Sequence, residues 1–565
     1  MFEGFKEKAT SVELASRIPV VLRIGVTGHR NLEYPTLIGD SVRKVIAELD
    51  QLLTRELKNS PHTFMALSPL AEGSDRVVAH EVLRWRGPGD CYHPFLEVVL
   101  PMSEEVYEKD FESPASVQEF REFLARARLI KVIDDARSRG DAFEIAGRYV
   151  VDGSDVLIAI WNGREAAGQG GTAEIVHYAR ESGRALVVID ASSGDISYEW
   201  DQAKLLAPIR ELDAYNAKRI RPGEIEAFSA NRDESFMART MSSGLPEDVL
   251  RPVERDLMPK YARASLLAKR YQRRYFNAGI ILYLMAMLAV ATVTAHVLFA
   301  EAYILPFIEE HWPGSPIDAT ALELIFKGAE ILEMLVILLV VWLSNHYGFH
   351  RQWIDYRFLA ERIRAAIFFT IAGIRYEPLK YPRYLNKSMQ SDYWIVKAFS
   401  WIWYASPLRQ PVNDLQKLKD FLKVAWIDDQ MGFYERGSRR QDRTNERWEY
   451  LGFGLFILTI LAASIPFVEV LGLHATVVDI RFLSLAGIIF PAGGASIAGY
   501  LALREFRRNA ERYEQMVQPM RNFSKQIEMA HSREALIGIV EEANELMLRE
   551  NQDWRINLLS QKLKP

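Results

Sequence analysis

Residues 155–161 read DVLIAIW, and residues 168–174, shortly after them, read GQGGTAE. The first stretch is a short apolar run without polar alternation, which is typical of a strand buried on both faces of a parallel sheet. The second stretch ends where a helix is expected to begin, near Ala173. Glycines let backbone N–H groups approach an anion, and the start of a helix carries a partial positive charge. This strand, loop and helix therefore predict a site for a phosphate group.

Four further apolar runs have the same character, and they occur at residues 20–26, 63–67, 96–100 and 185–190. Segments between them, such as 37–58 and 116–130, have the spacing of amphipathic helices. Alternation of strands and helices over residues 1–195 predicts an α/β domain with a doubly wound parallel sheet.

In a doubly wound sheet, ligands bind beyond the carboxyl ends of the strands. Glycines lie there beside charged or hydroxyl side chains. The candidate ligand-binding residues are Thr27, Gly28, His29, Arg30, Glu72, Gly73, Ser74, Asp75, Gly168, Gly170, Gly171, Thr172 and Glu174. A nucleotide or a ribose phosphate suits this set, so we expect a small nucleotide ligand and no further cofactor. Two plainer interpretations stay open, because glycines also form tight turns and Glu174 can simply stabilise a helix dipole.

Three motifs in this order, GVTGHR at 25–30, LAEGSD at 70–75 and GQGGTAE, resemble the SLOG superfamily of Rossmann-like domains. The resemblance implies nucleotide binding, either in a sensor of bacterial defence systems or in a LOG-type hydrolase of N-glycosidic bonds. The LOG motif is Pro-Gly-Gly-x-Gly-Thr-x-x-Glu with a catalytic glutamate at its end. Here no proline precedes the glycines, Ile175 occupies the last position, and Glu174 stands one residue earlier. Binding without catalysis is expected, and hydrolysis by Glu174 with Arg30 as phosphate anchor is the alternative.

Composition narrows the function further. Cys91 is the only cysteine, which excludes an intramolecular disulfide and fits a reducing compartment. The net charge of −5 gives no electrostatic basis for nucleic-acid binding. No His–Glu or Cys–His cluster has the spacing of metal ligands, so we expect no metal site.

The chain after residue 260 contains four apolar segments of the length that crosses a bilayer. They are residues 278–300, 325–345, 451–468 and 482–503. The segment 325–345 is the weakest, because Lys327, Glu330 and Glu333 occupy its first half, and a buried soluble helix is the alternative there. Arginines cluster at one end of each segment, which marks that end as cytoplasmic. We predict a mainly α-helical membrane region with four transmembrane helices and both termini in the cytoplasm.

This pattern divides the chain into five predicted regions. They are a ligand-binding domain at 1–195, a linker with connecting helices at 196–260, a first transmembrane hairpin with cytoplasmic extensions at 261–365, a cytoplasmic helical segment at 366–440, and a second hairpin with a C-terminal cytoplasmic helix at 441–565. The segments 356–364 (YRFLAERIR) and 506–514 (FRRNAERYE) form a weak internal repeat. Any charged helix that leaves a membrane could also produce that likeness. Hairpins followed by charged helices resemble SLATT-type effector regions.

The two resemblances together imply a sensor-effector of the bacterial inner membrane. A cyclic nucleotide or an ADP-ribose derivative would bind the cytosolic domain, and the spans would then permeabilise the membrane in antiphage defence by abortive infection. The expected partners are the nucleotide, the lipid bilayer and further copies of the chain. Ala495 and Gly499 have the spacing of a close helix contact, either between protomers or within one. Glu330 and Glu333 are candidate pore-lining residues, unless the helix begins later and leaves them among the external headgroups.

Overall fold

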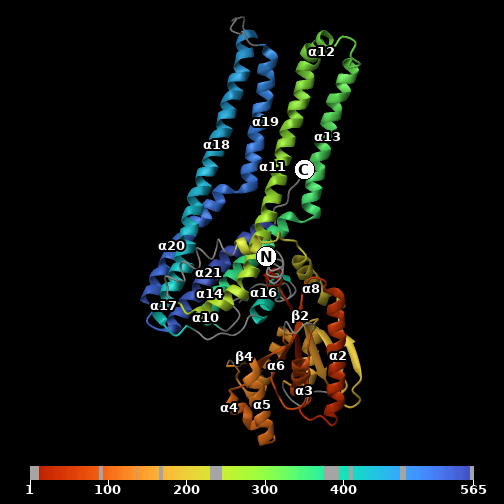
Figure 1. Cartoon of the computed structure of the whole chain (residues 1–565), viewed down its shortest axis with the longest axis vertical. Coiled ribbons are helices and arrows are strands. Elements are labelled where there is room, and N and C mark those ends of the chain that lie inside the picture. Colours follow the sequence, from red (N-terminus) through yellow and green to blue (C-terminus); the bar gives the residue numbers. More distant parts are fainter. Residues whose placement is uncertain are drawn as a thin grey trace, which may run out of the picture. The chain divides into compact units, whose positions relative to one another are not determined.

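In a computed structural model of the chain, the described residues are 12–87, 93–134, 136–164, 170–228, 245–374, 394–405, 412–470 and 479–559 (Figure 1). The chain divides into two compact units. The first comprises Met1–Asn231, Pro246–Arg263 and Glu361–Val412, and the second comprises Arg232–Leu245, Ala264–Ala360 and Asn413–Pro565. The first unit contains the sheet and the second contains long helices. The five regions predicted from the sequence stay predictions.

The first unit is built on a seven-stranded sheet with the strand order β4-β3-β2-β1-β5-β6-β7. The strands are β1 (Val20–Gly28), β2 (His62–Ser68), β3 (Phe95–Leu100), β4 (Ala127–Val132), β5 (Val156–Ile160), β6 (Ala185–Ile189) and β7 (Ile196–Glu199). All neighbours pair in parallel except β6 and β7, which pair antiparallel. The predicted α/β class and all five predicted strands are confirmed.

Helices cover the sheet in two layers. The contacting pair α2 (Pro35–Glu56) and α3 (Ser74–Arg84) forms one layer, and the contacting pair α6 (Arg139–Gly153) and α7 (Thr172–Glu181) belongs to the other. The second pair packs on a buried cluster that includes Leu157 and Ala159 of β5. Because both faces are covered, the central strands β1, β2, β3 and β5 are largely buried, as is typical of doubly wound sheets.

One helix is shorter than its sequence spacing predicts. The spacing indicates a helix throughout 116–130, but α5 (Pro114–Arg126) ends at Arg126 and β4 follows at once. Residues Leu129 and Ile130 pair with β3, at Glu97 and Val98. Pairing with the sheet edge overrides the helical spacing in these residues, since an edge strand satisfies the backbone groups that a helix would otherwise satisfy.

The remaining elements of the first unit are helical. They are α4 (Glu104–Tyr107), η2 (Glu108–Asp110), α8 (Gln202–Asn216), α10 (Glu247–Asp256) and α16 (Trp394–Ala405). Of these, α16 comes from far along the sequence and packs against α8 and β1. A segment that follows the first predicted hairpin therefore forms part of the unit that contains the sheet.

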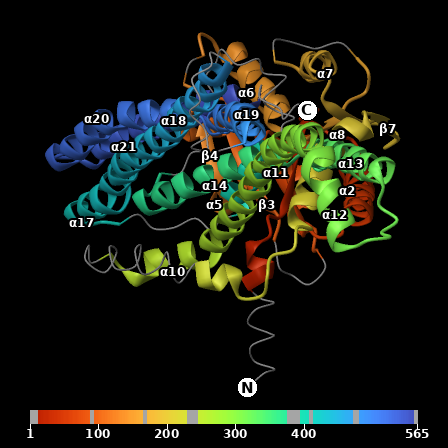
Figure 2. The ribbon, with the colours of Figure 1, turned by 90° about the horizontal axis from the view of Figure 1, so that it is seen from above.

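The second unit is helical. Its elements are α11 (Met258–Phe299, which begins in the first unit), η3 (Ala300–Ile304), α12 (Leu305–His311), α13 (Ala319–His346), α14 (Phe349–Ala372, which ends in the first unit), α17 (Leu415–Phe421), η4 (Leu422–Asp428), α18 (Asp429–Val470), α19 (Ile480–Arg504), α20 (Phe506–Met529) and α21 (Arg533–Leu559). Helix α18 packs along both α19 and α20, and α20 also contacts α21 (Figures 1 and 2).

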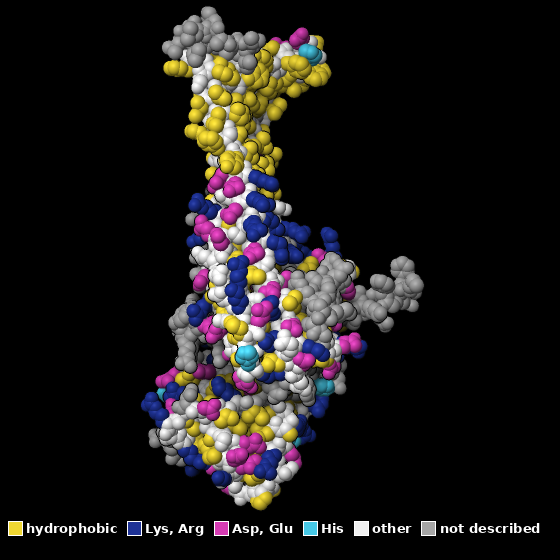
Figure 3. Space-filling view, turned by 90° about the vertical axis from the view of Figure 1, so that its left-hand side faces the viewer, with side chains coloured by type: hydrophobic (Ala, Val, Ile, Leu, Met, Phe, Trp, Pro, Cys, Tyr) yellow, Lys and Arg dark blue, Asp and Glu magenta, His cyan; other side chains and the backbone are white. Residues whose placement is uncertain are grey.

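Three helical stretches of the described residues are long and apolar enough to cross a membrane, at Met258–His311, Leu415–Phe467 and Ile480–Met529. They contain the predicted spans 278–300 and 482–503, and all but the last residue of 451–468. The fourth predicted span lies in α13, which is not one of the three stretches, and it stays a prediction. Large apolar side chains are exposed along α11, α13, α18 and α19. Figure 3 shows one face of the helical part, and its upper portion is mostly hydrophobic.

A residue with positive φ lies between two pairs of consecutive long helices. Gly348 (φ +57°) separates α13 from α14, and Glu505 (φ +47°) separates α19 from α20. The two hairpins thus share an architecture. The repeated segments 356–364 and 506–514 start at different distances from these two breaks. Arg357 follows Gly348 by nine residues, whereas Arg507 follows Glu505 by two. The offset amounts to about two helical turns.

Candidate functional site

The order of the strands reverses between β1 and β5, the central neighbours of the sheet. In open α/β sheets, ligands bind beyond the carboxyl ends of the strands at such a point. Gly28 at the end of β1 pairs with Ile160 at the end of β5. The His29 N–H donates to the Ile160 carbonyl over 3.2 Å, and the Asn162 N–H donates to Nε2 of His29 over 3.3 Å. The segments after these two strands are therefore held together.

The loop after β2 joins the same place. Both the N–H and the hydroxyl of Ser74 donate to the His29 carbonyl, over 3.1 and 2.8 Å. A Cβ on Gly28 would lie 2.4 Å from Oγ of Ser74, and a Cβ on Gly73 (φ +75°) would lie 2.0 Å from the Arg30 carbonyl oxygen. Both positions need a glycine because the two loops lie close together: Gly73 packs against the backbone of Arg30, and Gly28 packs against the side chain of Ser74. The motifs GVTGHR and LAEGSD thus lie side by side.

The same loop contains a strained residue. Leu70 is buried and has φ +59°, a conformation that side chains with a Cβ rarely adopt. Its N–H donates to Oγ of Ser68 over 3.0 Å, and its carbonyl accepts from Nε of Arg76 over 3.2 Å. Strain of this kind persists where the surroundings over-determine the backbone, which is common at ligand sites.

Asp75 lies under this loop and accepts from the Ala71 N–H over 3.1 Å. Burial raises the pKa of the Asp75 carboxyl to about 7, although the Ala71 hydrogen bond and the charges of Arg30 and Arg76 act in the opposite direction. Tyr107 lies close enough to feel both the Asp75 and Arg30 charges, and burial raises its pKa as well. In the described part of the chain, nothing forms a hydrogen bond with the Tyr107 hydroxyl.

Phe143 of α6 links the glycine-rich turn to the first loop. The Arg30 guanidinium carbon lies 5.2 Å from the centroid of the Phe143 ring. A Cβ on Gly170 (φ +77°) would lie 2.9 Å from the Cβ of Phe143, so the turn passes directly over that residue. The ring of Tyr107 also contacts Phe143, at 6.1 Å between centroids. Phe143, Tyr107 and Asn162 are not among the candidates predicted from the sequence, since single aromatic or amide residues have no local signature.

The glycine-rich turn is closed by its own glutamate. Glu174, in the first turn of α7, accepts from the Gly170 N–H over 2.8 Å through Oε2. Gly171 is the N-cap residue and Thr172 is the first residue of α7. This contact favours the plainer interpretation of Glu174 as a residue that stabilises the helix start. Gly168 lies outside the described residues.

The remaining predicted residues are placed as follows. Thr27 lies in β1 and pairs with Ala159. Glu72 accepts from the hydroxyl of Ser116 and, over 3.0 Å, from the Glu112 N–H, so its carboxylate is directed toward the start of α5. Among the described residues, no group of three or more His, Cys, Asp or Glu side chains could hold a metal ion.

On the amino-terminal side of the central strands, away from the candidate site, an ion pair anchors α16. Nζ of Lys397 lies 3.0 Å from Oδ1 of Asp155, and Oδ2 of Asp155 accepts from the Arg23 N–H over 3.0 Å. Burial raises the pKa of the Asp155 carboxyl, but the Lys397 charge and these hydrogen bonds outweigh it, so that the pKa is lowered. Arg23 belongs to β1 and Asp155 immediately precedes β5. The ion pair therefore lies at the start of β5 and beside the fourth residue of β1, the two strands that end at the candidate site.

In the second unit, the two candidate pore-lining residues are buried. Oε1 of Glu333 accepts from the Thr292 hydroxyl of α11 over 2.8 Å, and Glu330 lies 3.2 Å from Nζ of Lys327. Oε2 of Glu333 has no hydrogen-bond partner among the described residues. Glu333 thus faces α11 across the first hairpin.

Gly499 packs within the chain. A Cβ there would lie 2.4 Å from the Tyr283 ring of α11, and Oγ of Ser496 donates to the Tyr283 carbonyl over 3.2 Å. Of the two open possibilities for Gly499, the contact within one protomer is the one that the structure contains. Gly494 lies on the same helix, and a Cβ added there would meet no described residue within 4 Å.

The helices from η4 onward are similar to a known family. Residues 425–554 match the SMODS and SLOG-associating 2TM effector domain 1. The match covers α18, α19, α20 and most of α21, which is one hairpin and the two helices after it. It supports the resemblance of this part to SLATT-type membrane effectors of defence-type systems, and with the three apolar helices it indicates a membrane protein. No curated protein matches the chain.

Proposed function

We propose that this protein is a ligand-gated membrane effector. A nucleotide-derived signal, such as a cyclic nucleotide or an ADP-ribose derivative, binds the α/β unit at the carboxyl ends of β1 and β5. An oligomer of the helical unit then permeabilises the bacterial inner membrane, as in antiphage defence by abortive infection. The observation that carries the proposal is the joining of three sequence motifs at the reversal of strand order, in one chain with a two-span effector segment.

The chemistry of the site supports a phosphate-bearing ligand. Arg30 supplies a guanidinium, and the start of α7 at Gly171 and Thr172 supplies backbone N–H groups with the positive end of the helix dipole. Tyr107 offers a buried hydroxyl without a hydrogen-bond partner among the described residues. The SLOG-like interpretation of the first unit rests on these motifs and belongs to the proposal.

The effector half of the proposal rests on the helical unit. Helix α13 exposes Leu332 and Trp342 to 62% and 56%, as much as the three apolar stretches expose their own large side chains, so we include it as the fourth span. Exposed apolar surface of this extent requires lipid or protein to cover it. Buried Glu330 and Glu333 would become part of a cation path only if the α11–α13 hairpin opens in the assembly.

Connectivity suggests how the signal reaches the spans. Residues 361–412 belong to the first unit, yet in sequence they lie between the two hairpins. The Asp155–Lys397 ion pair fixes this segment to the start of β5 and to Arg23 of β1, and the carboxyl ends of these two strands form the candidate site. A ligand that shifts these strands would therefore act on the segment that connects both hairpins.

The alternative is a membrane-tethered nucleotide N-glycoside hydrolase that uses Glu174 with Arg30. The Glu174 carboxylate is already engaged by the Gly170 N–H, which disfavours a role as general base. Incubation with candidate nucleotides separates the two functions, because a sensor returns its ligand intact and a hydrolase does not.

The test uses the full chain in detergent and in liposomes. A panel of cyclic nucleotides, ADP-ribose and nucleoside triphosphates is screened by thermal shift, since a ligand at a hundredfold excess over Kd stabilises by about 2.7 kcal/mol. A ligand that raises Tm, is recovered unchanged and starts dye release from liposomes supports the proposal. Dye release without any ligand, or binding without release, would contradict ligand gating.

A further inference from the structure

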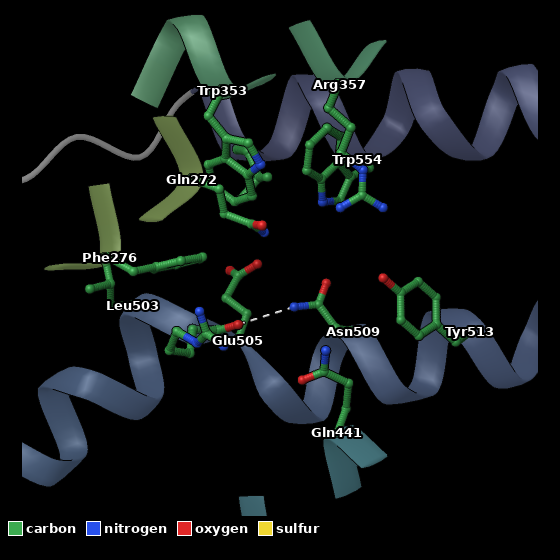
Figure 4. Close-up of a pocket in the computed structure, with 12 residues that line it drawn as sticks. Gln272, Phe276, Trp353, Arg357, Gln441, Leu503, Glu505, Asn509, Tyr513 and Trp554 are labelled. Carbon is green, nitrogen blue, oxygen red and sulfur yellow. Dashed lines mark hydrogen bonds between the residues drawn. The ribbon is translucent and has the colours of Figure 1, made fainter. Parts of the chain in front are cut away.

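A cavity lies at the inner ends of the predicted spans in the second unit (Figure 4). Its volume is about 470 Å³, the open mouth included, and its lining comes from α11, α14, α18, α19, α20 and α21. Phe276 stands two residues before the span 278–300, and Leu503 is the last residue of the span 482–503. With the orientation predicted from the arginine clusters, the cavity lies at the depth of the inner lipid headgroups.

The break between α19 and α20 forms one wall. Glu505 is in the left-handed region, with φ +47°, which is disfavoured for a residue with a Cβ. The break is held by the Glu505 N–H, which donates to the Leu501 carbonyl over 2.9 Å, and by Nδ2 of Asn509, which donates to the Arg504 carbonyl over 3.1 Å. A strained position kept by two hydrogen bonds at a cavity wall indicates a functional constraint.

Arg504 differs from the arginines that follow it. Arg507, Arg508 and Arg512 pair with the carboxylates of Glu511, Glu505 and Glu550, at 3.2, 3.2 and 3.0 Å. Within the described ranges, no carboxylate forms an ion pair with Arg504. Its guanidinium carbon lies 4.1 Å from the Phe276 centroid and 5.0 Å from that of Phe506. Its positive charge therefore remains available to an anion that enters the cavity.

Polar groups without protein partners surround the same space. Figure 4 shows the side chains of Gln272 and Gln441 directed into the cavity from α11 and α18. In the part of the chain that the structure describes, neither amide forms a hydrogen bond. Amide N–H groups are donors for phosphate oxygens. The Glu505 carboxylate, which also lines the cavity, is offset by its pair with Arg508.

Aromatic rings form the opposite wall. The rings of Trp353 and Trp554 pack edge to face at 5.7 Å, and Trp353 also contacts Phe276 at 5.1 Å. The guanidinium carbon of Arg357 lies 4.5 Å from the Trp554 centroid, which places a second cation at the cavity. Tryptophan beside arginine is typical of the membrane–water boundary.

We propose that this cavity binds the phosphate-bearing headgroup of an anionic phospholipid from the inner leaflet. Arg504 would hold the phosphate, because a guanidinium presents forked donors that fit phosphate oxygens. Gln272 and Gln441 would donate to the remaining oxygens, and the acyl chains would leave along Leu503. Basic pockets between helices on the cytoplasmic side are known to recognise such headgroups. The proposal does not depend on the nucleotide signal. Because the lining includes helices of both hairpins, an occupied cavity would stabilise their inner ends.

The test measures lipid binding to the purified full chain in non-ionic detergent by native mass spectrometry, with phosphatidylglycerol and phosphatidylcholine as probes. We expect tighter binding of phosphatidylglycerol. Arg504→Gln should weaken that binding about tenfold, the effect of losing one charge-assisted contact. Arg507→Gln is the matched control: it removes the same charge three residues away, and less than about a twofold change is expected there because that side chain is exposed and already paired.

Three outcomes would overturn the proposal. They are equal binding of the two lipids, equal weakening by Arg504→Gln and Arg507→Gln, and equal stabilisation of the chain by inorganic phosphate at the same concentration, which would show a site for free phosphate. If Arg504→Gln does not fold, Gln272→Leu decides, because this change removes an amide donor from the cavity lining without removing a charge. It should weaken the binding of phosphatidylglycerol several-fold, and unchanged binding would refute the assignment.

Discussion

Nζ of Lys397 lies 3.0 Å from Oδ1 of Asp155, although 242 residues separate the two in sequence. The pair joins a segment that lies between the two predicted hairpins to two central strands of the sheet, at the start of β5 and at Arg23 of β1. Its position opposite the candidate ligand site makes it the contact through which we expect the α/β unit to act on that segment.

The first prediction concerns this pair. Lys397→Met leaves the buried Asp155 carboxylate without its cation, which should cost about 3 kcal/mol and lower Tm by several degrees. The control is Arg251→Gln, which breaks an exposed pair with Glu247 and should change stability by less than about 1 kcal/mol. Because the pKa of Asp155 is lowered in the folded state, the stabilisation is complete above the unfolded pKa and is lost as the pH falls through the folded pKa. The gap between wild type and Lys397→Met should therefore narrow below about pH 4.

The second prediction concerns Asp75, whose pKa burial raises to about 7. Between the unfolded pKa near 4 and the folded pKa, the folded state binds the extra proton, so this group makes stability fall as the pH rises through that window and then level off. Asp75→Asn removes the titration. Tm measured from pH 4 to 8 should therefore decline less in Asp75→Asn than in the wild type, and parallel curves would refute the raised pKa.

The third prediction tests the glycine-rich turn. Gly171→Asp adds a negative side chain at the N-cap of α7, where a phosphate would approach, and should reduce affinity for the signal at least about a hundredfold. Gly538→Asp is the control, because a side chain at that helical position meets nothing within 4 Å. Thermal shift with the ligand found in the panel measures both. Unchanged affinity in Gly171→Asp would exclude a phosphate at this turn.

A companion change, Glu174→Gln, separates sensor from hydrolase. It keeps a side-chain oxygen that can accept from the Gly170 N–H, so binding should weaken only modestly. A variant that binds as the wild type does but has lost nucleotide turnover would favour the hydrolase.

The fourth prediction distinguishes two glycines of α19. Gly499→Leu should destabilise the chain, since its side chain would collide with the Tyr283 ring. Gly494→Leu meets open space, so it should leave Tm unchanged and dissociate oligomers in detergent if that face of α19 is the contact between protomers. Mass measured by light scattering checks both. An unchanged mass in Gly494→Leu would place the interface elsewhere.

The fifth prediction concerns Glu330 and Glu333. The double variant Glu330→Gln/Glu333→Gln should lower the ratio of cation to anion flux in liposomes once the ligand is present, because it removes the buried negative charge of the first hairpin. Thr292→Val is the companion variant, since it removes the hydroxyl that donates to Glu333 but keeps both carboxylates. Equal flux and equal selectivity in the double variant and the wild type would place the carboxylates outside the conduction path.

Local patterns in the sequence were sufficient to predict most helices and strands of the fold. The apolar runs that became β1, β2, β3, β5 and β6 are buried on both faces, and the spans in α11, α18 and α19 are long uncharged stretches. In both cases burial or a bilayer acts on consecutive residues, so the signal is contained in a window of the chain. Residues 127–130 have the spacing of a helix, but pairing with strand β3 makes them part of strand β4 instead.

Contacts between distant residues needed the tertiary structure. The sequence identified Gly28, Gly73 and Gly170 as unusual, but only packing shows that the first two allow two loops to approach closely. It contains no signal for Phe143 beneath Arg30, for Leu70 in a left-handed conformation, or for the Asp155–Lys397 pair. Each of these depends on which strands and helices become neighbours. Which elements become neighbours depends on the apolar surface buried over the whole unit, so it cannot be predicted from any single stretch of residues.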